Sequence, residues 1–266
     1  MERLDPRSAL ELARAALAAA PAGLLTDLDG TLAPIVTDPP SARALPGAAD
    51  ALAALGRRLA VVGIVTGRSA GDARRILGRD DVLVIGNHGL EWLEPGAGQP
   101  TAAPGLVDVA DALERALAAV PNEPGVSVDH KGLSATVHFR NASDPAGARQ
   151  RVHAALVGAA IQGIELRPGR MSLEVRPRGA GDKGTAVQEV VARHALRGLV
   201  VIGDDVTDLD MFRGAQRARS VGGLACAVLG VGGGGEVPHE VADAADVMLP
   251  DTRAVLDLLR TLAEPT

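Results

Sequence analysis

The sequence predicts an α/β protein in which a doubly wound parallel sheet is covered by helices and carries an inserted α+β module. Two patterns support this class. Several short apolar runs are rich in β-branched residues, lack polar alternation and end abruptly in Gly and polar residues. Such continuous apolar strands are buried on both faces, as in a parallel sheet between helices. From about Thr101 to Pro177 the strands alternate instead, which is typical of an antiparallel sheet with one solvent-exposed face.

Four apolar runs define the expected parallel strands, and helical stretches separate them along the chain. The strands are Leu24–Leu25, Val61–Val65, Val82–Ile85 and Leu199–Ile202. The helices are Gly47–Leu59, Ala70–Leu77 and Thr185–Ala195. In sheets of this kind ligands bind outside the carboxyl ends of the strands, so the polar motifs that follow the four runs are expected to meet at one site.

The middle of the chain is expected to form the inserted module. Apolar and polar residues alternate in Leu133–Arg140 and again in Met171–Arg176, and the segment Pro145–Ala159 between them is helical in character. The sequence therefore predicts a core made of residues 1–102 and 178–266, with residues 103–177 as a separate α+β domain.

Composition excludes several classes of protein. The 266 residues include 27 Lys and Arg against 33 Asp and Glu, which gives a net charge of −6. The chain has no basic run, and binding to nucleic acid requires clustered Lys and Arg to neutralise phosphates. No Tyr, two Phe and one Trp leave too few aromatic rings for base-stacking platforms or membrane-interface belts.

The N-terminal sequence, the apolar stretches and the cysteine content indicate the cellular compartment. The first twenty residues carry charges between their apolar positions, which predicts an amphipathic surface helix and not a signal peptide. No stretch reaches the roughly 18 apolar residues of a membrane-spanning helix. Cys226 is the single cysteine, and its run Ala225–Leu229 is typical of a core strand. We expect a reduced, cytoplasmic protein without nucleic-acid or membrane partners. A monomer is favoured, and the oligomeric state is left open.

Asp27 and Asp29 follow the first strand two positions apart. In extended chain, positions i and i+2 face the same side, so both carboxylates can address one substrate atom. One can act as a nucleophile and the other as a general acid and base if their environments separate their pKa values. The alternative is an ordinary turn, because Asp-Gly is common in turns.

A second acidic cluster follows the fourth strand and contains Asp204, Asp205 and Asp208. Carboxylates crowded at one site repel one another unless a cation is present, and oxygen ligands suit Mg²⁺. The alternative is a helix N-terminus with Asp capping, where negative charge is favourable.

Two further features suit a phosphorylated ligand. Lys183 stands where a helix begins, after Asp182 as its N-cap. A cation there opposes the helix dipole, which is a reason to consider another duty, such as neutralising a phosphate. The alternative is a solvated surface Lys. Thr66, with Gly67 and Arg68, offers a hydroxyl and backbone N–H groups that can hold phosphoryl oxygens at a strand end.

Four motifs, taken in order, resemble those of the haloacid dehalogenase (HAD) phosphatase superfamily, whose core is a Rossmann-like sheet. They are Asp-x-Asp-Gly-Thr (27–31), Thr-Gly-Arg (66–68), Lys183 and Gly-Asp-Asp-x-x-Asp (203–208). The resemblance implies that Asp27 is a nucleophile forming an aspartyl phosphate and that Asp29 is the general acid and base. It implies that Thr66 binds the phosphoryl group and that Lys183 neutralises charge around Asp27. It also implies a Mg²⁺ ion held by the carboxylates of Asp27, Asp29, Asp204, Asp205 and Asp208.

Longer matches resemble the trehalose-6-phosphate phosphatases of that superfamily. They cover residues 27–35, 38–39 with Ala42, 86–89, 174–177 and 204–212. In that family the inserted module is a cap that closes over the site and reads the disaccharide. Its pattern of an acid, any residue and Lys, then a later His-x-Arg, is present at 129–131 and 138–140. Two positions depart from the family: the cap acid is Asp129 where Glu is usual, and Leu28 stands where Tyr or Phe is common.

The resemblance and the alternation of the cap strands together give a set of substrate-binding candidates. They are Gly67, Arg68, His88, Asp129, Lys131, His138, Arg140 and Glu174. Charged donors and acceptors suit sugar hydroxyls, because a wrong substrate leaves them unpaired. A merely solvated sheet face is the alternative for the cap residues. His88 is either part of the site or a structural turn histidine, and Trp92 is expected to pack in the core.

The expected function is Mg²⁺-dependent hydrolysis of trehalose 6-phosphate, a small-molecule sugar phosphate, to trehalose and phosphate. One alternative is a related capped phosphatase that acts on sucrose 6-phosphate, mannosyl-3-phosphoglycerate or a trehalose-like phosphate. Another is a phosphoacceptor switch without catalysis. Asp29 argues against the switch, because a phosphoacceptor needs no acid and base two residues after the nucleophile.

Overall fold

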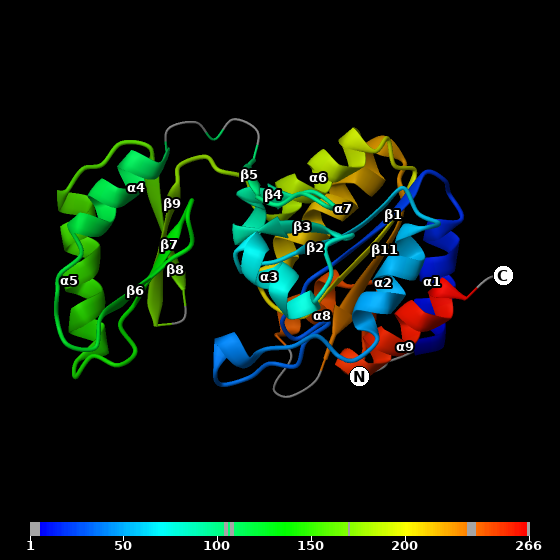
Figure 1. Cartoon of the computed structure of the whole chain (residues 1–266), viewed down its shortest axis with the longest axis horizontal. Helices are drawn as coiled ribbons and strands as arrows, with labels where there is room; N and C mark the ends of the chain where they lie inside the picture. Colours follow the sequence, from blue (N-terminus) through cyan, green and yellow to red (C-terminus); the bar gives the residue numbers. More distant parts are fainter. Residues whose placement is uncertain (1–5, 104–105, 107–108, 170, 233–237, 265–266) are drawn as a thin grey trace. The chain divides into compact units, whose positions relative to one another are not determined.

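The computed structural model describes residues 6–103, 106, 109–169, 171–232 and 238–264 (Figure 1). The chain divides into two compact units, each described here by itself. Unit 1 comprises Met1–Thr101 and Gly181–Thr266, and unit 2 comprises Ala102–Ala180. The segment 103–177, expected as an insert, lies within unit 2. No helix in the described ranges combines the length and apolar character needed to span a membrane.

Unit 1 is built on an eight-stranded sheet with the order β12-β11-β10-β1-β2-β3-β4-β5. Its strands are β1 (Ala22–Thr26), β2 (Val61–Val65), β3 (Leu83–Gly86), β4 (Glu91–Leu93), β5 (Thr101–Ala102), β10 (Gly198–Gly203), β11 (Ala225–Val231) and β12 (Val247–Leu249). All pairs from β12 to β3 are parallel, and β4 runs antiparallel to β3. The predicted α/β class is confirmed. The edge strands were not predicted, because runs of two or three residues carry no periodic signal.

Helices cover both faces of this sheet (Figure 1). One face carries α1 (Pro6–Leu17), α2 (Ala48–Gly56), α3 (Ala70–Leu77) and α9 (Thr252–Ala263), whose apolar residues share one cluster with the strands. On the other side α6 (Lys183–Arg193) packs on α7 (Asp208–Gly222), which contacts β10, β11 and α8 (His239–Ala244). Two short 3₁₀ turns are η1 (Pro39–Ser41) and η2 (Asn87–Gly89). The core is made mainly of Ala, Val and Leu.

Some boundaries differ from the prediction. The helix expected over 47–59 ends at Gly56. The helical stretch expected over 185–195 begins two residues earlier at Lys183, which is the helix start predicted from Asp182 as N-cap. The earlier start follows from a capping box: the Asp182 side chain accepts the Thr185 N–H, and the Thr185 side chain accepts the Asp182 N–H. The amphipathic N-terminal helix begins at Pro6, and residues 1–5 lie outside the described ranges.

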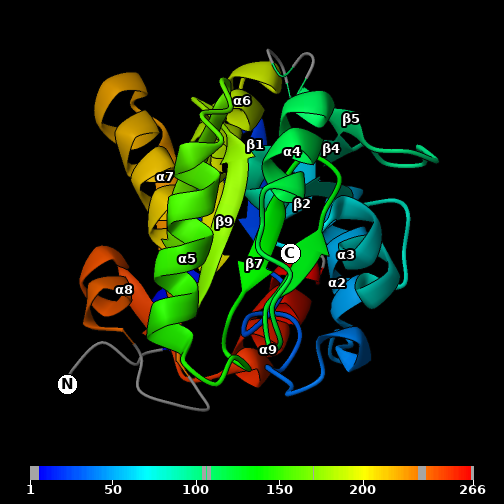
Figure 2. The same ribbon diagram turned by 90° about the vertical axis from the view of Figure 1, so that its left-hand side faces the viewer.

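Unit 2 is an antiparallel sheet with two helices on one face. The strand order is β6-β7-β9-β8, with β6 (Ser127–His130), β7 (Ala135–His138), β8 (Ile164–Gly169) and β9 (Ser172–Pro177). Helices α4 (Val109–Ala118) and α5 (Pro145–Gly158) lie in front of this sheet in Figure 2. Ala135, Val137, Leu173 and Val175 face the helices and form the unit's apolar core with them. The alternate residues therefore occupy the opposite face of the sheet.

Candidate active site

Asp27 lies directly beyond the end of β1, the central strand of the parallel sheet. Its backbone N–H donates to the carbonyl of Ile202 on the neighbouring strand β10 at 2.8 Å. This bond keeps the ends of the two strands together, so the segments after β1 and β10 meet. The Asp27 side chain is buried, and its Oδ1 lies 2.6 Å from Nζ of Lys183. A residue 156 positions away in the sequence is thus its closest charged partner.

Lys183 is the first residue of α6, and it is buried. Its ammonium group donates to Asp27 and, at 2.7 Å, to Oδ1 of Asp208, the first residue of α7. Burial works against the cation, but the charges of Asp208 and Asp27 outweigh it and raise the pKa of Lys183 above its ordinary value. The side chain therefore stays protonated at neutral pH. The predicted role beside Asp27 agrees with this contact.

The Asp208 carboxylate organises the loop after β10. Its Oδ2 accepts the backbone N–H groups of Asp204 at 2.9 Å and Asp205 at 3.1 Å. The Asp204 carboxylate in turn accepts the Thr31 hydroxyl at 3.0 Å. A side chain at Gly30, whose φ is +83°, would overlap that carboxylate. Glycine at position 30 therefore allows the two acidic loops to approach each other.

The three carboxylates fit a cation. One oxygen from each of Asp27, Asp204 and Asp208 lies within 4.8 Å of the others. With Lys183 as the adjacent cation, three carboxylates leave two negative charges uncompensated in a buried place. Burial and the charge of Asp208 raise the pKa of Asp27, and burial with the same neighbour raises the pKa of Asp204 to about 7. Hard oxygen donors with excess negative charge suit a divalent cation such as Mg²⁺.

Two of the five predicted metal carboxylates lie outside this cluster. Asp205 is exposed, and its side chain accepts the backbone N–H of Val206 at 2.7 Å. Asp29 pairs instead with Arg68: Nε lies 2.6 Å from Oδ2, and Nη2 lies 2.8 Å from Oδ1. Arg68 also donates to Asp72 at 2.9 Å, so α3 anchors the guanidinium from its other side. The two carboxylates after β1 thus have different partners, as the assignment of different roles requires.

The Thr66-Gly67-Arg68 segment follows β2 and leads into α3. The Thr66 side chain is buried, and its Oγ1 accepts the backbone N–H of Arg68 at 3.2 Å. The Glu91 carboxylate accepts the backbone N–H of Ala70 at 2.6 Å, and burial raises its pKa. Sequence reasoning missed Glu91, although a lone acid directly before the predicted core residue Trp92 was a usable signal. Trp92 is buried, as predicted.

On unit 2 a row of polar residues crosses the sheet on the face opposite the helices. Strand register aligns Asp129 with Thr136, Thr136 with Glu174, and Glu174 with Arg167. Directly paired residues share a face. The structure therefore brings the predicted Asp129 and Glu174 onto one surface and adds Arg167, which was missed because β8 was not predicted. The alternation in Ile164–Gly169 was the available signal.

The other predicted residues of this unit lie near that row. The Nζ atom of Lys131 lies 3.8 Å from Oδ2 of Asp129. His138 pairs with Ser172 in the register, and its pKa is lowered by partial burial and by the nearby Lys131 and Arg140. Arg140 is exposed. Arg176, expected on the solvated face, is instead buried, and it donates to the carbonyl of Ala180 at 3.1 Å.

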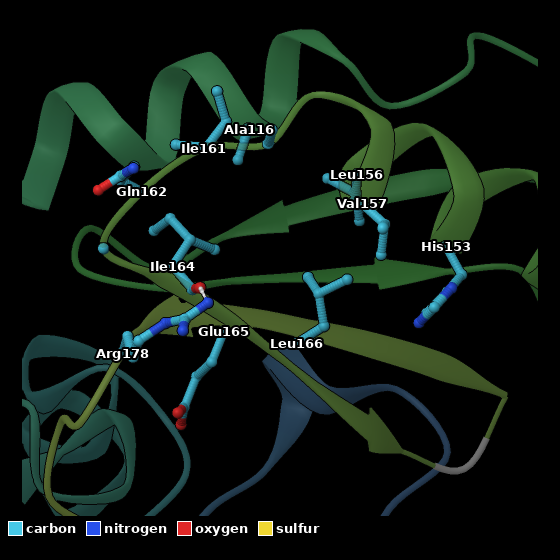
Figure 3. Close-up of a pocket in the computed structure, with 12 residues that line it drawn as sticks. Ala116, His153, Leu156, Val157, Ile161, Gln162, Ile164, Glu165, Leu166 and Arg178 are labelled. Carbon is cyan, nitrogen blue, oxygen red and sulfur yellow. Dashed lines mark hydrogen bonds between the residues drawn. The ribbon is translucent and has the colours of Figure 1, made fainter.

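A groove of about 600 Å³ also lies within unit 2, between its helices and β8 (Figure 3). Leu156, Ile164 and Leu166 supply apolar lining, and His153 and Arg178 supply polar groups. Arg178 donates to the carbonyl of Ile164 at 3.4 Å, so its guanidinium is partly used by the fold. None of the predicted site residues is among those that line the groove. The candidate site is therefore the carboxylate cluster of unit 1.

A known protein family matches most of the chain. A family profile described as "Trehalose-phosphatase" matches residues 25–236, which include all of the acidic motifs and the segment of unit 2. The chain belongs to the trehalose-phosphatase family. The family resemblance inferred from the motifs is thereby confirmed, and the family is one of phosphatases.

Curated relatives are about 35% identical to the chain over the residues that align. Trehalose-phosphate phosphatase from Mycobacterium leprae is 35% identical over 217 residues, 74% of this chain and 48% of the relative. The protein of that name from Mycobacterium tuberculosis is 36% identical over 223 residues, 78% of this chain and 54% of the relative. An uncharacterized glycosyl hydrolase from the same species is 35% identical over 202 residues, but only 15% of it is covered. The chain thus spans about half the length, or less, of these relatives.

Solved structures from the trehalose-phosphatase family share the fold. The C-terminal domain of Candida albicans trehalose-6-phosphate phosphatase matches with a TM-score of 0.72 at 22% identity, covering 98% of this chain and 97% of that one. A trehalose-6-phosphate phosphatase related protein matches with a TM-score of 0.69 at 25% identity, covering 91% and 96%.

Proposed function

We propose that the chain is a Mg²⁺-dependent phosphatase that hydrolyses trehalose 6-phosphate to trehalose and inorganic phosphate. Membership of the family supports the reaction, and the names of the relatives support the substrate. The observation that carries the proposal is the buried contact of 2.6 Å between Asp27 and Lys183 beside two further carboxylates. A carboxylate held at a strand end, next to a fixed cation, is suited to attack phosphorus and to tolerate the incoming charge.

The proposed first step transfers the phosphoryl group to the enzyme. A carboxylate oxygen of Asp27 bonds to phosphorus, and the bond from phosphorus to the sugar oxygen breaks. The carboxyl group of Asp29 gives its proton to that leaving oxygen. The Thr66 hydroxyl and the Lys183 ammonium bind the phosphoryl oxygens and offset their negative charge.

The proposed second step releases phosphate. Asp29, now a carboxylate, takes a proton from a water molecule, and the water oxygen attacks phosphorus. The bond from phosphorus to Asp27 breaks, which regenerates the nucleophile. In the structure Arg68 donates to both oxygens of Asp29 at 2.6 and 2.8 Å, and this bidentate pair fixes the orientation of the Asp29 side chain.

Asp27 and Asp204 are the proposed direct ligands of Mg²⁺, because both oxygens of Asp208 already accept hydrogen bonds from Lys183 and the loop. When bound, Mg²⁺ supplies positive charge that stabilises the phosphoryl oxygens in the transition state. Asp208 contributes to the metal site by holding Lys183 and the backbone of Asp204 in place. Asp205 contributes from the exposed edge of the carboxylate cluster.

Removal of the metal is expected to stop turnover. Excess EDTA should abolish phosphate release and added Mg²⁺ should restore it. Asp204→Ala should raise the Mg²⁺ concentration that gives half the maximal rate by at least about tenfold. Even residues that only hydrogen-bond to a metal ligand change the metal affinity by this factor. Asp210→Ala, which removes a half-buried carboxylate paired with Arg213 in the first turn of α7, is the control. An unchanged Mg²⁺ requirement in Asp204→Ala would assign that carboxylate a purely structural role.

The two parts of the chain have different proposed duties. Residues 1–102 and 178–266 carry the chemistry, and residues 103–177 form a cap that reads the sugar. Support comes from the row Asp129, Thr136 and Glu174, which presents charged and hydroxyl groups on the sheet face opposite the one that packs on the unit's helices. Lys131 lies beside this row. Such groups discriminate sugars because a wrong substrate leaves them unpaired.

A substrate comparison tests the trehalose assignment. Glu174→Ala or Lys131→Ala should lower kcat/KM for trehalose 6-phosphate roughly 10- to 100-fold, since each charged hydrogen bond contributes about 1.5–3 kcal/mol. Hydrolysis of para-nitrophenyl phosphate, which lacks the sugar, should change less than about threefold. Glu114→Ala, on α4, is the control because it removes an exposed acid of the helical side.

The pattern of losses separates the alternatives. Equal loss with both substrates would mean that these residues support the fold. No loss with either would mean that the natural substrate is another sugar phosphate, which a phosphate-release screen over sucrose 6-phosphate and mannosyl-3-phosphoglycerate would identify. A chain that becomes phosphorylated but releases no phosphate would be a phosphoacceptor switch.

A further inference from the structure

We propose that the turn Asn87-His88 is the element that positions the phosphoryl-binding segment Thr66-Gly67-Arg68, and that His88 acts through this segment and not on the sugar. The inference rests on the proposed phosphatase function and deepens it. Of the two alternatives for His88, it favours the structural turn histidine over a substrate ligand.

The backbone of this turn is unusual. Asn87 has φ +49° and His88 has φ +57°, and both are residues with side chains in the left-handed region. Asn tolerates this conformation better than most residues, and two such residues in succession are uncommon. Strained backbone persists where surrounding structure fixes it and is concentrated at functional sites. In this turn the surrounding structure is the segment after β2.

Both left-handed residues donate their N–H groups to that segment. The N–H of His88 donates to the carbonyl of Thr66 at 2.9 Å, and the N–H of Asn87 donates to the carbonyl of Arg68 at 2.7 Å. A peptide unit is planar and trans, so fixing a carbonyl also fixes the N–H of the next residue in the opposite direction. The two bonds therefore set the directions of the Gly67 and Ser69 N–H groups, which lie on the side of the segment away from the turn.

The His88 ring fixes the same segment by its shape. A Cβ placed on Gly67 would lie 2.6 Å from both Cε1 and Nε2 of His88, closer than such atoms can approach. The imidazole thus occupies the space that a side chain at position 67 would need. A side chain at position 67 would have to displace the ring, and glycine lets the backbone of the segment lie against it.

The turn also touches the start of α6. A Cβ on Gly89, whose φ is +110°, would lie 2.8 Å from the carbonyl oxygen of Asp182, the N-cap residue before Lys183. One short turn therefore packs against two parts of the proposed machinery, the segment that holds Thr66 and the helix start that holds Lys183. Its backbone conformation sets the spacing of both.

The test compares two substitutions at position 88 with a control. His88→Val imposes a β-branched residue that disfavours the left-handed backbone, and His88→Asn retains a residue that accepts it. Ala195→Val is the matched control, because Ala195 also has positive φ, +47°, but is exposed after the far end of α6. Affinity for inorganic phosphate is measured by calorimetry with Mg²⁺ present, together with kcat and KM for para-nitrophenyl phosphate and trehalose 6-phosphate.

His88→Val should weaken phosphate binding and lower kcat/KM for both substrates by the same factor, about 100-fold, as expected for a displaced binding segment. His88→Asn should recover most of this loss. Ala195→Val should lower thermal stability and leave the kinetic constants in place. If His88→Val does not fold, Gly67→Ala gives a second test, because it displaces the same segment at a partly exposed position and should produce the same uniform loss.

Three outcomes would overturn the inference. Loss with trehalose 6-phosphate alone in both position-88 variants would make His88 a sugar ligand. An equal loss of kcat/KM in His88→Asn and His88→Val with both substrates would indicate that the imidazole binds the phosphate itself. Unchanged phosphate affinity in His88→Val and Gly67→Ala would remove any positioning role. Failure of the unmodified chain to hydrolyse either ester would instead refute the proposed function, and phosphate affinity would still decide the inference.

Discussion

Asp27→Asn is expected to lose turnover by a factor on the order of 10⁴ or more while the chain stays folded. An amide cannot form the acyl phosphate, so the proposed route is closed and not merely slowed. Stability should not fall, because burial and Asp208 already raise the pKa of Asp27 and make its charge unfavourable. Asn keeps an oxygen that can accept from Lys183. Phosphate release from para-nitrophenyl phosphate and a thermal melt together measure both effects.

The control for this variant is Asp257→Asn, which alters an exposed carboxylate on α9. It should match the unmodified chain in rate. Turnover of Asp27→Asn within tenfold of the parent would remove Asp27 as nucleophile. A variant that loses both turnover and its thermal transition would show that the carboxylate holds the strand ends together.

Lys183→Met should lose activity and destabilise unit 1 at once. The ammonium is the partner of Asp27 at 2.6 Å and of Asp208 at 2.7 Å, and all three side chains are buried. Removing one member of a buried ion pair leaves the other charge uncompensated, which costs about 3–5 kcal/mol. Because the raised pKa keeps Lys183 protonated, this loss is present throughout the neutral range.

Urea unfolding measures this loss of free energy of unfolding. EDTA is present so that no metal cation takes the place of the Lys183 ammonium. Lys131→Met is the control, since it removes the other lysine at a half-buried place near the surface of unit 2. Added Mg²⁺ should recover part of the stability of Lys183→Met but not its activity. If Lys183→Met is as stable as the parent, the buried carboxylates are neutral and the proposed charge balance of the site is wrong.

The sequence by itself determined the central parallel strands of the sheet and the edge at which the chemistry lies. Val61–Val65 and Leu199–Ile202 are continuous apolar runs, and only a parallel sheet buried on both faces accommodates them. The carboxyl ends of such strands share one edge, so the pattern alone predicted that Asp27 and Asp204 lie close together. Asp182 as N-cap of α6 was likewise predictable, because capping depends on adjacent residues.

Only the tertiary structure decided which partner each of these side chains takes. Arg68 pairs with Asp29 across 39 residues, Asp208 holds Lys183 across 25, and the turn at His88 contacts Thr66 through its backbone. Periodicity reports which face of an element is buried, but it carries no information on contacts between distant loops. Arg176 shows the same limit, because a charged residue in an alternating strand was expected in solvent and lies buried beside Glu165. Such partners depend on how the loops pack, and that packing is settled only when the whole chain has folded.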